Sequence, residues 1–253
     1  MPSSQNNRQL PKKKPPAKKQ WKAAPSKPSA TLAKTTNKPT SKKLGKRPAP
    51  PLEVLKLFKR YYPDAHCALD HQSAFQLLVA TILSAQCTDV RVNLVTPALF
   101  AEFPGPSAMA KAPLSRLELL IRSTGFYKNK AKNIKACAQA LLKEHNGEVP
   151  KELDQLIKLA GVGRKTANVV LGNAFGIISG IVVDTHVTRL SNRLGWVKSQ
   201  NAEIIERELQ KIIPHEDWIM ISHWLITHGR EVCKARSPQC NTCFLSELCP
   251  KLM

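Results

Sequence analysis

Apolar residues recur three and four positions apart along most of the chain after residue 51, which is the spacing of a helix face that packs on a core. Period-two alternation, the pattern of half-buried strands, persists nowhere, and no repeat of solenoid length is present. The pattern therefore predicts an all-α protein. The segments with helical periodicity are 52–62, 73–83, 90–100, 114–122, 129–145, 153–160, 164–174, 184–194, 201–213 and 218–228.

Three polar residues stand where a helix is expected to begin. Ser73, Asp89 and Asp184 each precede an apolar-periodic run. Side-chain oxygens of Ser and Asp accept hydrogen bonds from the first free N–H groups of a helix, so we expect all three to be N-caps. Capping alone accounts for Asp89.

The first 51 residues differ sharply from the rest in composition. They hold 14 of the 39 Lys and Arg residues, none of the 18 Asp and Glu residues, and ten of the 19 prolines. Such a segment cannot bury enough apolar surface to offset its ordering entropy, so we expect a disordered tail. Two Lys-rich runs in it, 11–19 and 41–47, resemble nuclear-import signals, although a solvated polycation that holds DNA phosphates loosely is the simpler interpretation.

The remaining chain holds 25 basic and 18 acidic residues, a balance that is compatible with a nucleic-acid partner but weak evidence alone. No run of about eighteen apolar residues exists, so no membrane span is expected. The N-terminus also lacks the apolar core of a secretory signal. Cysteines in such a chain favour metal binding over disulfides.

The stretch 156–186 contains a Gly-Val-Gly turn between two apolar-periodic segments. Gly161 and Gly163 permit positive φ and keep the turn free of side chains. N–H groups of the turn and of the following helix start can hold a phosphate, which carries no sequence information. A lone G-x-G turn is often an ordinary helix corner, but the apolar framing on both sides favours a DNA clamp.

Lys165 lies in the first turn of the helix that follows these glycines. The helix dipole, the neighbouring Arg164 and partial burial would each favour the free amine, which is how a Lys nucleophile is prepared for Schiff-base chemistry. A solvated contact to a phosphate is the simpler interpretation for an isolated lysine. The sequence around the turn leaves both open.

Asp184 follows an apolar Ile-Val-Val run and precedes a helix. Besides capping that helix, a carboxylate emerging from buried chain could stabilise developing positive charge on a sugar. It could equally orient or deprotonate a nucleophile.

Four cysteines near the end of the chain have the spacing C-x6-C-x2-C-x5-C. Four thiolates within seventeen residues suit either a zinc site or a 4Fe–4S cluster, and the single C-x2-C pair favours iron–sulfur. These candidate ligands are Cys233, Cys240, Cys243 and Cys249. The other three, Cys67, Cys87 and Cys137, are expected to be small core residues.

A turn at 123–130 places Phe126 after a glycine and among the basic residues Arg122, Lys128 and Lys130. The aromatic ring could pack locally. It could instead be a wedge that enters a base stack.

Taken together, these motifs resemble the endonuclease III family of bifunctional DNA glycosylases in the helix-hairpin-helix superfamily. The residues that carry the resemblance are L-A-G-V-G-R-K-T-A-N-V-V-L, V-D-T-H-V-T-R-L-S-N-R, H-W-L-I-T-H-G-R and the cysteine spacing. The resemblance covers about 52–250. Ala160 departs from the family, which usually has proline before the glycine turn.

The resemblance implies an all-α, two-domain helix-hairpin-helix glycosylase fold with a C-terminal iron–sulfur loop. A six-helix barrel with the hairpin would span 68–179. The iron–sulfur domain would combine 52–67 with 180–253, and 1–51 would be the disordered basic tail.

The resemblance also implies removal of oxidised pyrimidines from duplex DNA, followed by strand cleavage at the abasic site. Lys165 matches the family nucleophile and Asp184 its catalytic carboxylate. Gln86 matches the residue that fills the space of the flipped base, and Phe126 the intercalating residue, which is often leucine. The further residues expected at the DNA are Gly161, Gly163, Arg164, His186, Lys234 and Arg236, and the cofactor implied is a 4Fe–4S cluster.

Two alternatives share parts of this pattern. A monofunctional adenine-mismatch glycosylase shares the hairpin, the aspartate and the cluster, but lacks a lysine at position 165 and usually continues beyond the cluster. A non-catalytic, structure-selective DNA-binding protein could use the hairpin and a zinc knot. We expect a monomer that acts on duplex DNA with damaged pyrimidines or abasic sites, in a bacterial nucleoid or, as the alternative, in a nucleus.

Overall fold

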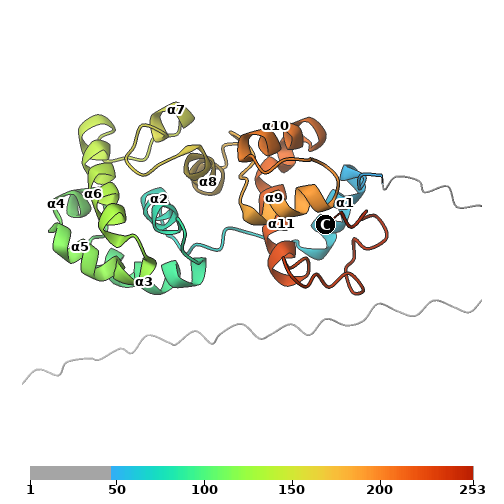
Figure 1. Cartoon of the computed structure of the whole chain (residues 1–253). Helices are drawn as coiled ribbons and strands as arrows, with labels where there is room; N and C mark the ends of the chain where they lie inside the picture. Colours follow the sequence, from blue (N-terminus) through green and yellow to red (C-terminus); the bar gives the residue numbers. More distant parts are fainter. Residues whose placement is uncertain (1–46, 253) are drawn as a thin grey trace, which may run out of the picture. The chain divides into compact units, whose positions relative to one another are not determined.

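The structure, a computed structural model, describes residues 47–252, and in this part of the chain the regular elements are all helices (Figure 1). The prediction of an all-α protein is confirmed. The α-helices are α1 Pro51–Tyr61, α2 Ala74–Leu83, α3 Asp89–Glu102, α4 Pro106–Lys111, α5 Leu114–Ile121, α6 Tyr127–Glu144, α7 Leu153–Leu156, α8 Arg164–Phe175, α9 Thr185–Arg193, α10 Ala202–Ile212 and α11 Trp218–Glu231. Two 3₁₀ turns, Arg122–Thr124 and His215–Asp217, complete the set.

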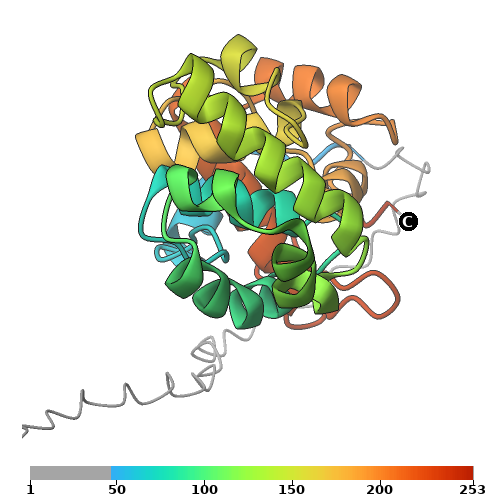
Figure 2. The same ribbon diagram turned by 90° about the vertical axis from the view of Figure 1, so that its left-hand side faces the viewer.

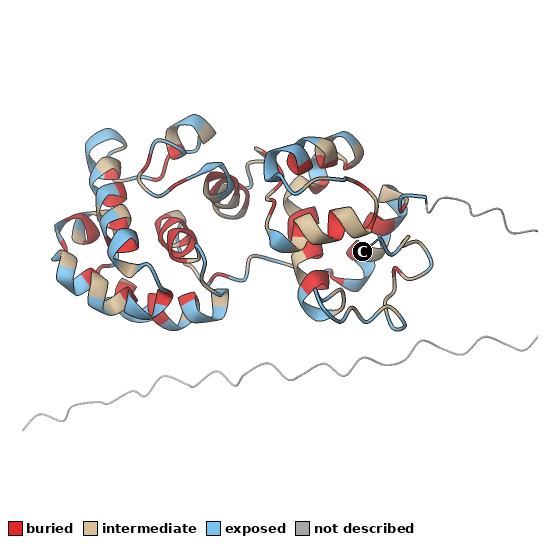
Figure 3. Cartoon of the chain, in the orientation of Figure 1, coloured by how far each residue is buried: buried red, intermediate tan, exposed pale blue. Residues whose placement is uncertain are grey.

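The first hydrophobic core lies among α2 to α8 and is built around α2. Every residue of α2 from Leu77 to Leu83 is buried, so the helix is apolar on all sides and is surrounded by others (Figure 3). It packs against α3, α6 and α8. Seen from the side, the long α6 crosses in front of this core (Figure 2). The helix that carries the candidate nucleophile is thus fixed against the most buried helix of its core.

The second core combines α1 with α9, α10 and α11, which follow more than 100 residues later in the chain. The buried face of α1 is formed by Val54, Leu55 and Phe58. The ring of Phe58 stacks near Tyr62 and Trp224, with centroids 6.1 and 6.2 Å away. Burial of such aromatic side chains holds the first described helix onto the last one.

Both cores lie within the compact part of the chain that the structure describes, 47–252, and α8, which belongs to the first core, also contacts α11. A Cβ at Gly172 of α8 would lie 3.2 Å from the Ile219 side chain of α11, so glycine allows this close approach without a shift of Ile219. Beside it, Nε2 of His223 lies 2.9 Å from Oδ1 of Asn173. The division into domains at 68–179 and at 52–67 with 180–253 stays a prediction.

Two of the three expected N-caps are confirmed. Ser73 accepts from Gln76 N at 3.2 Å, and Asp184 caps α9. The expectation for Asp89 is wrong, because Thr88 caps α3 and Asp89 is already helical. The Asp89 carboxylate instead pairs with Arg230 of α11 at 2.6 Å.

The periodicity placed the end of α7 too late and did not predict α4. The first helix of the hairpin, α7, ends at Leu156 rather than at residue 160, because the chain continues through tight turns such as Leu159 N to Leu156 O at 3.1 Å. Helix α4 was missed, since its six residues are too few to display a period. Pro106 begins it, as the fixed φ of proline allows.

The expected disordered tail falls mainly on residues 1–46, which lie outside the described residues. At its end, Ala49 is fully buried, and its N–H donates to Leu194 O at 2.8 Å. Its carbonyl accepts from Trp196 Nε1 at 2.8 Å. Among residues 47–252, no helix is long and apolar enough to cross a bilayer.

Candidate functional site

The glycine turn between α7 and α8 has two different glycines. Gly161 has φ of +78°, and a Cβ there would lie 2.9 Å from Cβ of Asn133 on α6, so conformation and space both require glycine. Gly163 has φ of −95°, which any residue can adopt, so the positive φ permitted there is not used. No atom lies within 4 Å of a Cβ at Gly163. The turn is therefore tight toward α6 and open at the start of α8.

The N-terminus of α8 is free to bind an anion. Gly163 is its N-cap, and within residues 47–252 no side chain caps its first turn. The exposed side chains of Arg164 and Lys165 flank these N–H groups. Free N–H groups, a helix dipole and two cations suit a phosphate.

Lys165 is exposed, so the partial burial expected for it is not present. Its position in the first turn of α8 and its neighbour Arg164 are as the sequence indicated. An exposed amine beside a phosphate site can reach a bound sugar.

Asp184 is half-buried and emerges from the buried residues Ile181 and Val183. Its Oδ1 accepts from the N–H groups of His186 and Val187, both at 2.8 Å. Its Oδ2 makes no hydrogen bond within residues 47–252. One oxygen thus fixes the carboxylate while the other remains free to face a substrate.

His186 is half-buried against α11, and a Cβ at Gly229 would lie 2.7 Å from its Nδ1. Burial is the main cause that lowers the pKa of His186, and Asp184 opposes it. The structure therefore places this predicted DNA contact beside Asp184, in close contact with α11.

Gln86 and Phe126 share an uncommon backbone conformation. Their φ values are +52° and +47°, in the left-handed region that costs an L-residue about 1–2 kcal/mol. Both side chains are exposed, and Phe126 is 64% exposed despite its size. Strain and exposure of an apolar ring are typical of residues selected for a function.

Lys130 connects the two segments that carry these residues. Sequence placed it among the basic residues around Phe126, but it is only 5% exposed. Its ammonium donates to Leu83 O, at the end of α2, and to Thr124 O, both at 2.8 Å. Burial lowers the pKa of Lys130. This lysine therefore holds the Gln86 loop and the Phe126 turn together, and is not available to DNA.

The four C-terminal cysteines line a single cavity with Leu190, Leu194 and Val232. No described cysteine forms a disulfide. N–H groups point at the sulfurs: Leu245 N lies 3.4 Å from Sγ of Cys243, and Lys251 N lies 3.4 Å from Sγ of Cys249. The cavity thus combines four cysteine sulfurs with apolar walls and backbone donors.

This set of donors fits an iron–sulfur cluster. Burial, which disfavours the charged thiolate, raises the pKa of Cys243 to about 11, and the charges of the other three cysteines add to this. Within the described chain, no three His, Cys, Asp or Glu side chains are close enough to hold one metal ion, although the four cysteines share a cavity. Four cysteine thiolates are the usual ligand set of a 4Fe–4S cluster.

Two arginines of α9, which none of the motifs indicated, hold the cysteine loop. Arg189 Nη2 donates to Gly229 O and Cys233 O, each at 3.0 Å. Arg193 Nη1 lies 3.3 Å from Sγ of Cys233 and 2.8 Å from Lys234 O. Their spacing of four residues on one helix face was the available signal.

The remaining predicted residues are two basic side chains of the cysteine loop and the three cysteines outside it. Lys234 and Arg236 are exposed on the loop between the first two cysteines. Cys137 is buried as expected, and burial raises its pKa to about 12. Cys67 and Cys87 are only half-buried at the edge of the first core, so the expectation of core residues is right for one of the three.

Two family models match the chain. The model for HhH-GPD superfamily base excision DNA repair proteins matches residues 79–215, which is more than half of the chain. The model for the iron-sulfur binding domain of endonuclease III matches residues 233–249, the span from the first to the last clustered cysteine.

Curated relatives and solved structures agree with these matches. Endonuclease III of Synechocystis sp. is 54% identical over 198 residues, which is 78% of this chain and 90% of that protein. Endonuclease III of Bacillus subtilis is 47% identical over 189 residues, covering 74% and 86%. A trapped endonuclease III–DNA covalent intermediate in an estranged-adenine complex has a TM-score of 0.74 at 48% identity, covering 79% of this chain and 95% of that one. The similarity therefore extends over the hairpin and the cysteine loop together.

Proposed function

Because the chain belongs to the endonuclease III family of base excision DNA repair proteins and is a DNA glycosylase and abasic-site lyase, we propose that Lys165 is its nucleophile and Asp184 its catalytic carboxylate. The observation that carries the proposal is the exposed Lys165 in the uncapped first turn of α8, directly after the glycine turn. A phosphate held by this turn would bring the adjacent sugar to the amine.

In the proposed reaction, the Lys165 amine and the Asp184 carboxylate act on the sugar of the damaged nucleotide. The damaged nucleotide leaves the base stack, and the Lys165 amine attacks C1′ of its sugar as the base departs with the bonding electron pair. The free Oδ2 of Asp184 stabilises the positive charge that develops on the sugar. The resulting imine makes the C2′ proton acidic, and β-elimination breaks the strand on the 3′ side.

The substrate we propose is duplex DNA with an oxidised pyrimidine or an abasic site. Gln86 would fill the space left by the extruded base, and Phe126 would enter the stack beside it. Their exposure and left-handed backbones support these roles. The turn at Gly161 and Gly163, Arg164 and His186 would contact the DNA nearby.

The C-terminal loop is an iron–sulfur binding domain, and its cofactor is a 4Fe–4S cluster rather than zinc. We propose Cys233, Cys240, Cys243 and Cys249 as the four ligands, on the strength of their shared cavity. The cluster would stabilise the loop that presents Lys234 and Arg236 to phosphates. The protein would act as a monomer at the bacterial nucleoid.

Borohydride trapping on a duplex with one oxidised pyrimidine tests the proposal. The wild type is expected to form a covalent protein–DNA adduct, and Lys165→Ala to form none. Lys158→Ala is the matched control, since Lys158 is an exposed lysine on the other side of the same turn. Absence of an adduct in the wild type would overturn the assignment and leave the monofunctional adenine-mismatch glycosylase as the better candidate.

A further inference from the structure

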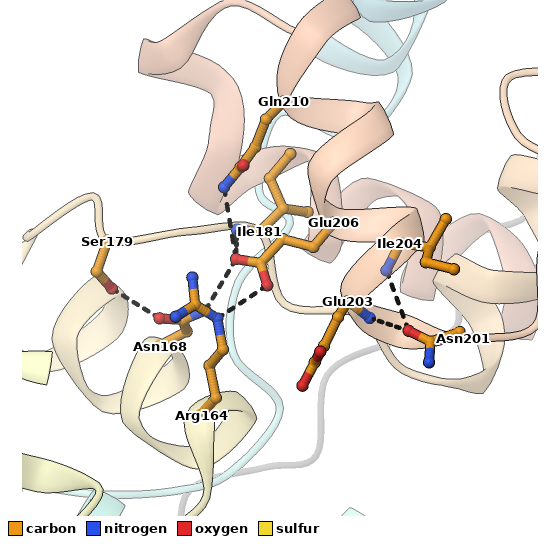
Figure 4. Close-up of polar contacts among 9 residues, drawn as sticks. All are labelled: Arg164, Asn168, Ser179, Ile181, Asn201, Glu203, Ile204, Glu206 and Gln210. Carbon is orange, nitrogen blue, oxygen red and sulfur yellow. Dashed lines mark hydrogen bonds and ion pairs between the residues drawn. The ribbon is translucent and has the colours of Figure 1, made fainter. Parts of the chain in front are cut away.

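Glu206 of α10 is a buried carboxylate that receives hydrogen bonds from several segments (Figure 4). It is only 7% exposed. Its Oε2 accepts from Arg164 Nε at 3.2 Å, and its Oε1 accepts from Asn168 Nδ2 at 3.3 Å and from Ile181 N at 3.2 Å. A buried carboxylate without such donors would be strongly destabilising, so these contacts explain how it is tolerated.

The positions of these partners relate Glu206 to both proposed catalytic residues. Arg164 immediately precedes Lys165 on α8, and Asn168 lies three residues after it. Ile181 lies three residues before Asp184, on the segment that leads into α9. The Glu206 carboxylate therefore contacts both α8, which carries Lys165, and the segment before α9, which carries Asp184.

The space around this carboxylate is tightly filled. A Cβ at Gly180 would collide with Oε1 of Glu206 and would lie 2.7 Å from Nδ2 of Asn168. Ser179 Oγ donates to Oδ1 of Asn168 at 2.9 Å, which fixes the orientation of that amide. Close packing thus confines the segment 179–181 to one position between α8 and α10.

We propose that Glu206 is a positioning residue whose carboxylate holds α8 and the 179–184 segment in register, and thereby aligns Lys165 with Asp184. The inference rests on the proposed function. Glu206 touches neither proposed catalytic side chain, so it acts through Arg164, Asn168 and the Ile181 N–H. Because misplacement by about 1 Å can slow an aligned reaction roughly 100-fold, loss of this register should appear in the rate of chemistry.

The test is Glu206→Gln in the full-length, cluster-loaded protein, under single-turnover conditions on a duplex with one oxidised pyrimidine. Glutamine keeps the size but loses the charge and turns an N–H₂ group toward the donors. The rate constant of base excision is expected to fall roughly 10- to 100-fold. The reaction amplitude, the Kd for the duplex and the visible absorbance of the cluster should stay within about twofold of the wild type.

Glu208→Gln is the matched control, because Glu208 lies on the same helix and pairs only with Lys211, at 2.7 Å. It should leave the rate constant unchanged. A second variant, Gly180→Ala, keeps every charged group but forces the Glu206 contacts apart, and it should lower the rate constant in the same way.

The outcomes separate this inference from the proposed function. If the wild type forms a borohydride-trapped adduct but Glu206→Gln and Gly180→Ala both excise at the wild-type rate constant, the positioning role is refuted. A lower amplitude with an unchanged rate constant would likewise refute it, because it would mean that Glu206 only stabilises the fold. If the wild type forms no adduct, the proposed function itself fails.

Discussion

Two regions of the protein are held by buried charges of opposite sign. In the proposed reacting region, around Lys165 and Asp184, the buried Glu206 carboxylate accepts hydrogen bonds from neighbouring backbone and side chains. In the proposed insertion region, around Gln86 and Phe126, the buried ammonium of Lys130 donates to carbonyls of the two segments. The reacting region has relaxed helical starts, whereas both residues of the insertion region have positive φ.

The difference follows from what each region must do. Proton and bond rearrangement depends on reproducible distances, so the reacting groups sit at helix N-termini whose geometry is set by capping and close packing. A side chain that enters a base stack must project from the surface, and a left-handed backbone directs Phe126 outward at a local energetic cost. Rigidity is thus obtained by a buried carboxylate beside relaxed helix starts in one region and by a buried ammonium behind strained turns in the other.

The largest effect is expected for Asp184→Asn. Asparagine caps a helix as well as aspartate does, so the melting temperature should change little. The excision rate should fall roughly 10²–10³-fold, because the charge that stabilises the transition state is lost. Single-turnover kinetics and thermal melting measure the two properties.

Ser73→Ala is the control for Asp184→Asn, since it removes a cap of α2 and nothing else. It should cost about 1 kcal/mol of stability with no change in rate. Equal rates for Asp184→Asn and the wild type would show that Asp184 is a cap alone, and the contrast between the two regions would disappear.

Lys130→Met should destabilise the protein by about 3–4 kcal/mol, because it leaves the carbonyls of Leu83 and Thr124 without a donor. Urea denaturation measures this loss. Lys135→Met is the matched control, since Lys135 also lies on α6 but donates to a single carbonyl, Ala112 O, at 2.7 Å. If both variants lose the same stability, Lys130 has no special part in holding the insertion region.

The stability of the protein is expected to depend on pH through His223, which forms a hydrogen bond with Asn173 near the C-terminal end of α8. Burial, aided by the charge of His66, lowers the pKa of His223 to about 4 from 6.5. As the pH falls, His223 therefore binds a proton in the unfolded chain before it does so in the folded protein. Its contribution to the free energy of unfolding is fully present above pH 6.5 and is lost as the pH falls toward 4, by roughly 2–3 kcal/mol.

Denaturation at pH 7 and at pH 4.5, in the wild type and in His223→Gln, measures this contribution. Glutamine can still donate to Asn173 but does not titrate. The variant should therefore lose less stability on acidification than the wild type. An identical loss in both proteins would mean that the reacting region has no titrating support at this end of α8.

The smallest effect is expected from relieving the backbone strain at Phe126. Phe126→Gly should stabilise the free protein by up to about 1 kcal/mol, because glycine adopts positive φ without strain and the ring is mostly exposed. The same variant should excise more slowly. Asn146→Gly is the control, since Asn146 has φ of +52° after α6, away from the proposed site. It should gain stability without losing activity.

The chain's periodicity predicted most helices and its motifs predicted the candidate site, because both depend on local spacing. Ser73 and Asp184 could be recognised as caps, since a cap acts on the next three residues. The choice between Thr88 and Asp89 could not be made, because it depends on the distant Arg230 that holds the Asp89 carboxylate. Helix α4 has too few residues for a period.

The buried charges were also missed, although the sequence contains a signal for them. Lys130 falls on the helix face of Ile134 and Leu141, and Glu206 falls on that of Leu209. A charged residue at an apolar position predicts burial with partners, but Leu83, one partner of Lys130, lies 47 residues away, and Arg164, one partner of Glu206, lies 42 residues away. Only the folded chain identifies them.

The second core has a consequence for biosynthesis. Of the described helices, α1 is synthesised first, but its partners α9 to α11 begin about 120 residues later. At ~5–20 residues per second, the apolar face of Val54, Leu55 and Phe58 is made roughly 6–24 s before them. The helices of the first core are all complete before α9 has been made. The helices of the first core can therefore pack while the apolar face of α1 still lacks its partners, and a chaperone would have this face to protect during that interval.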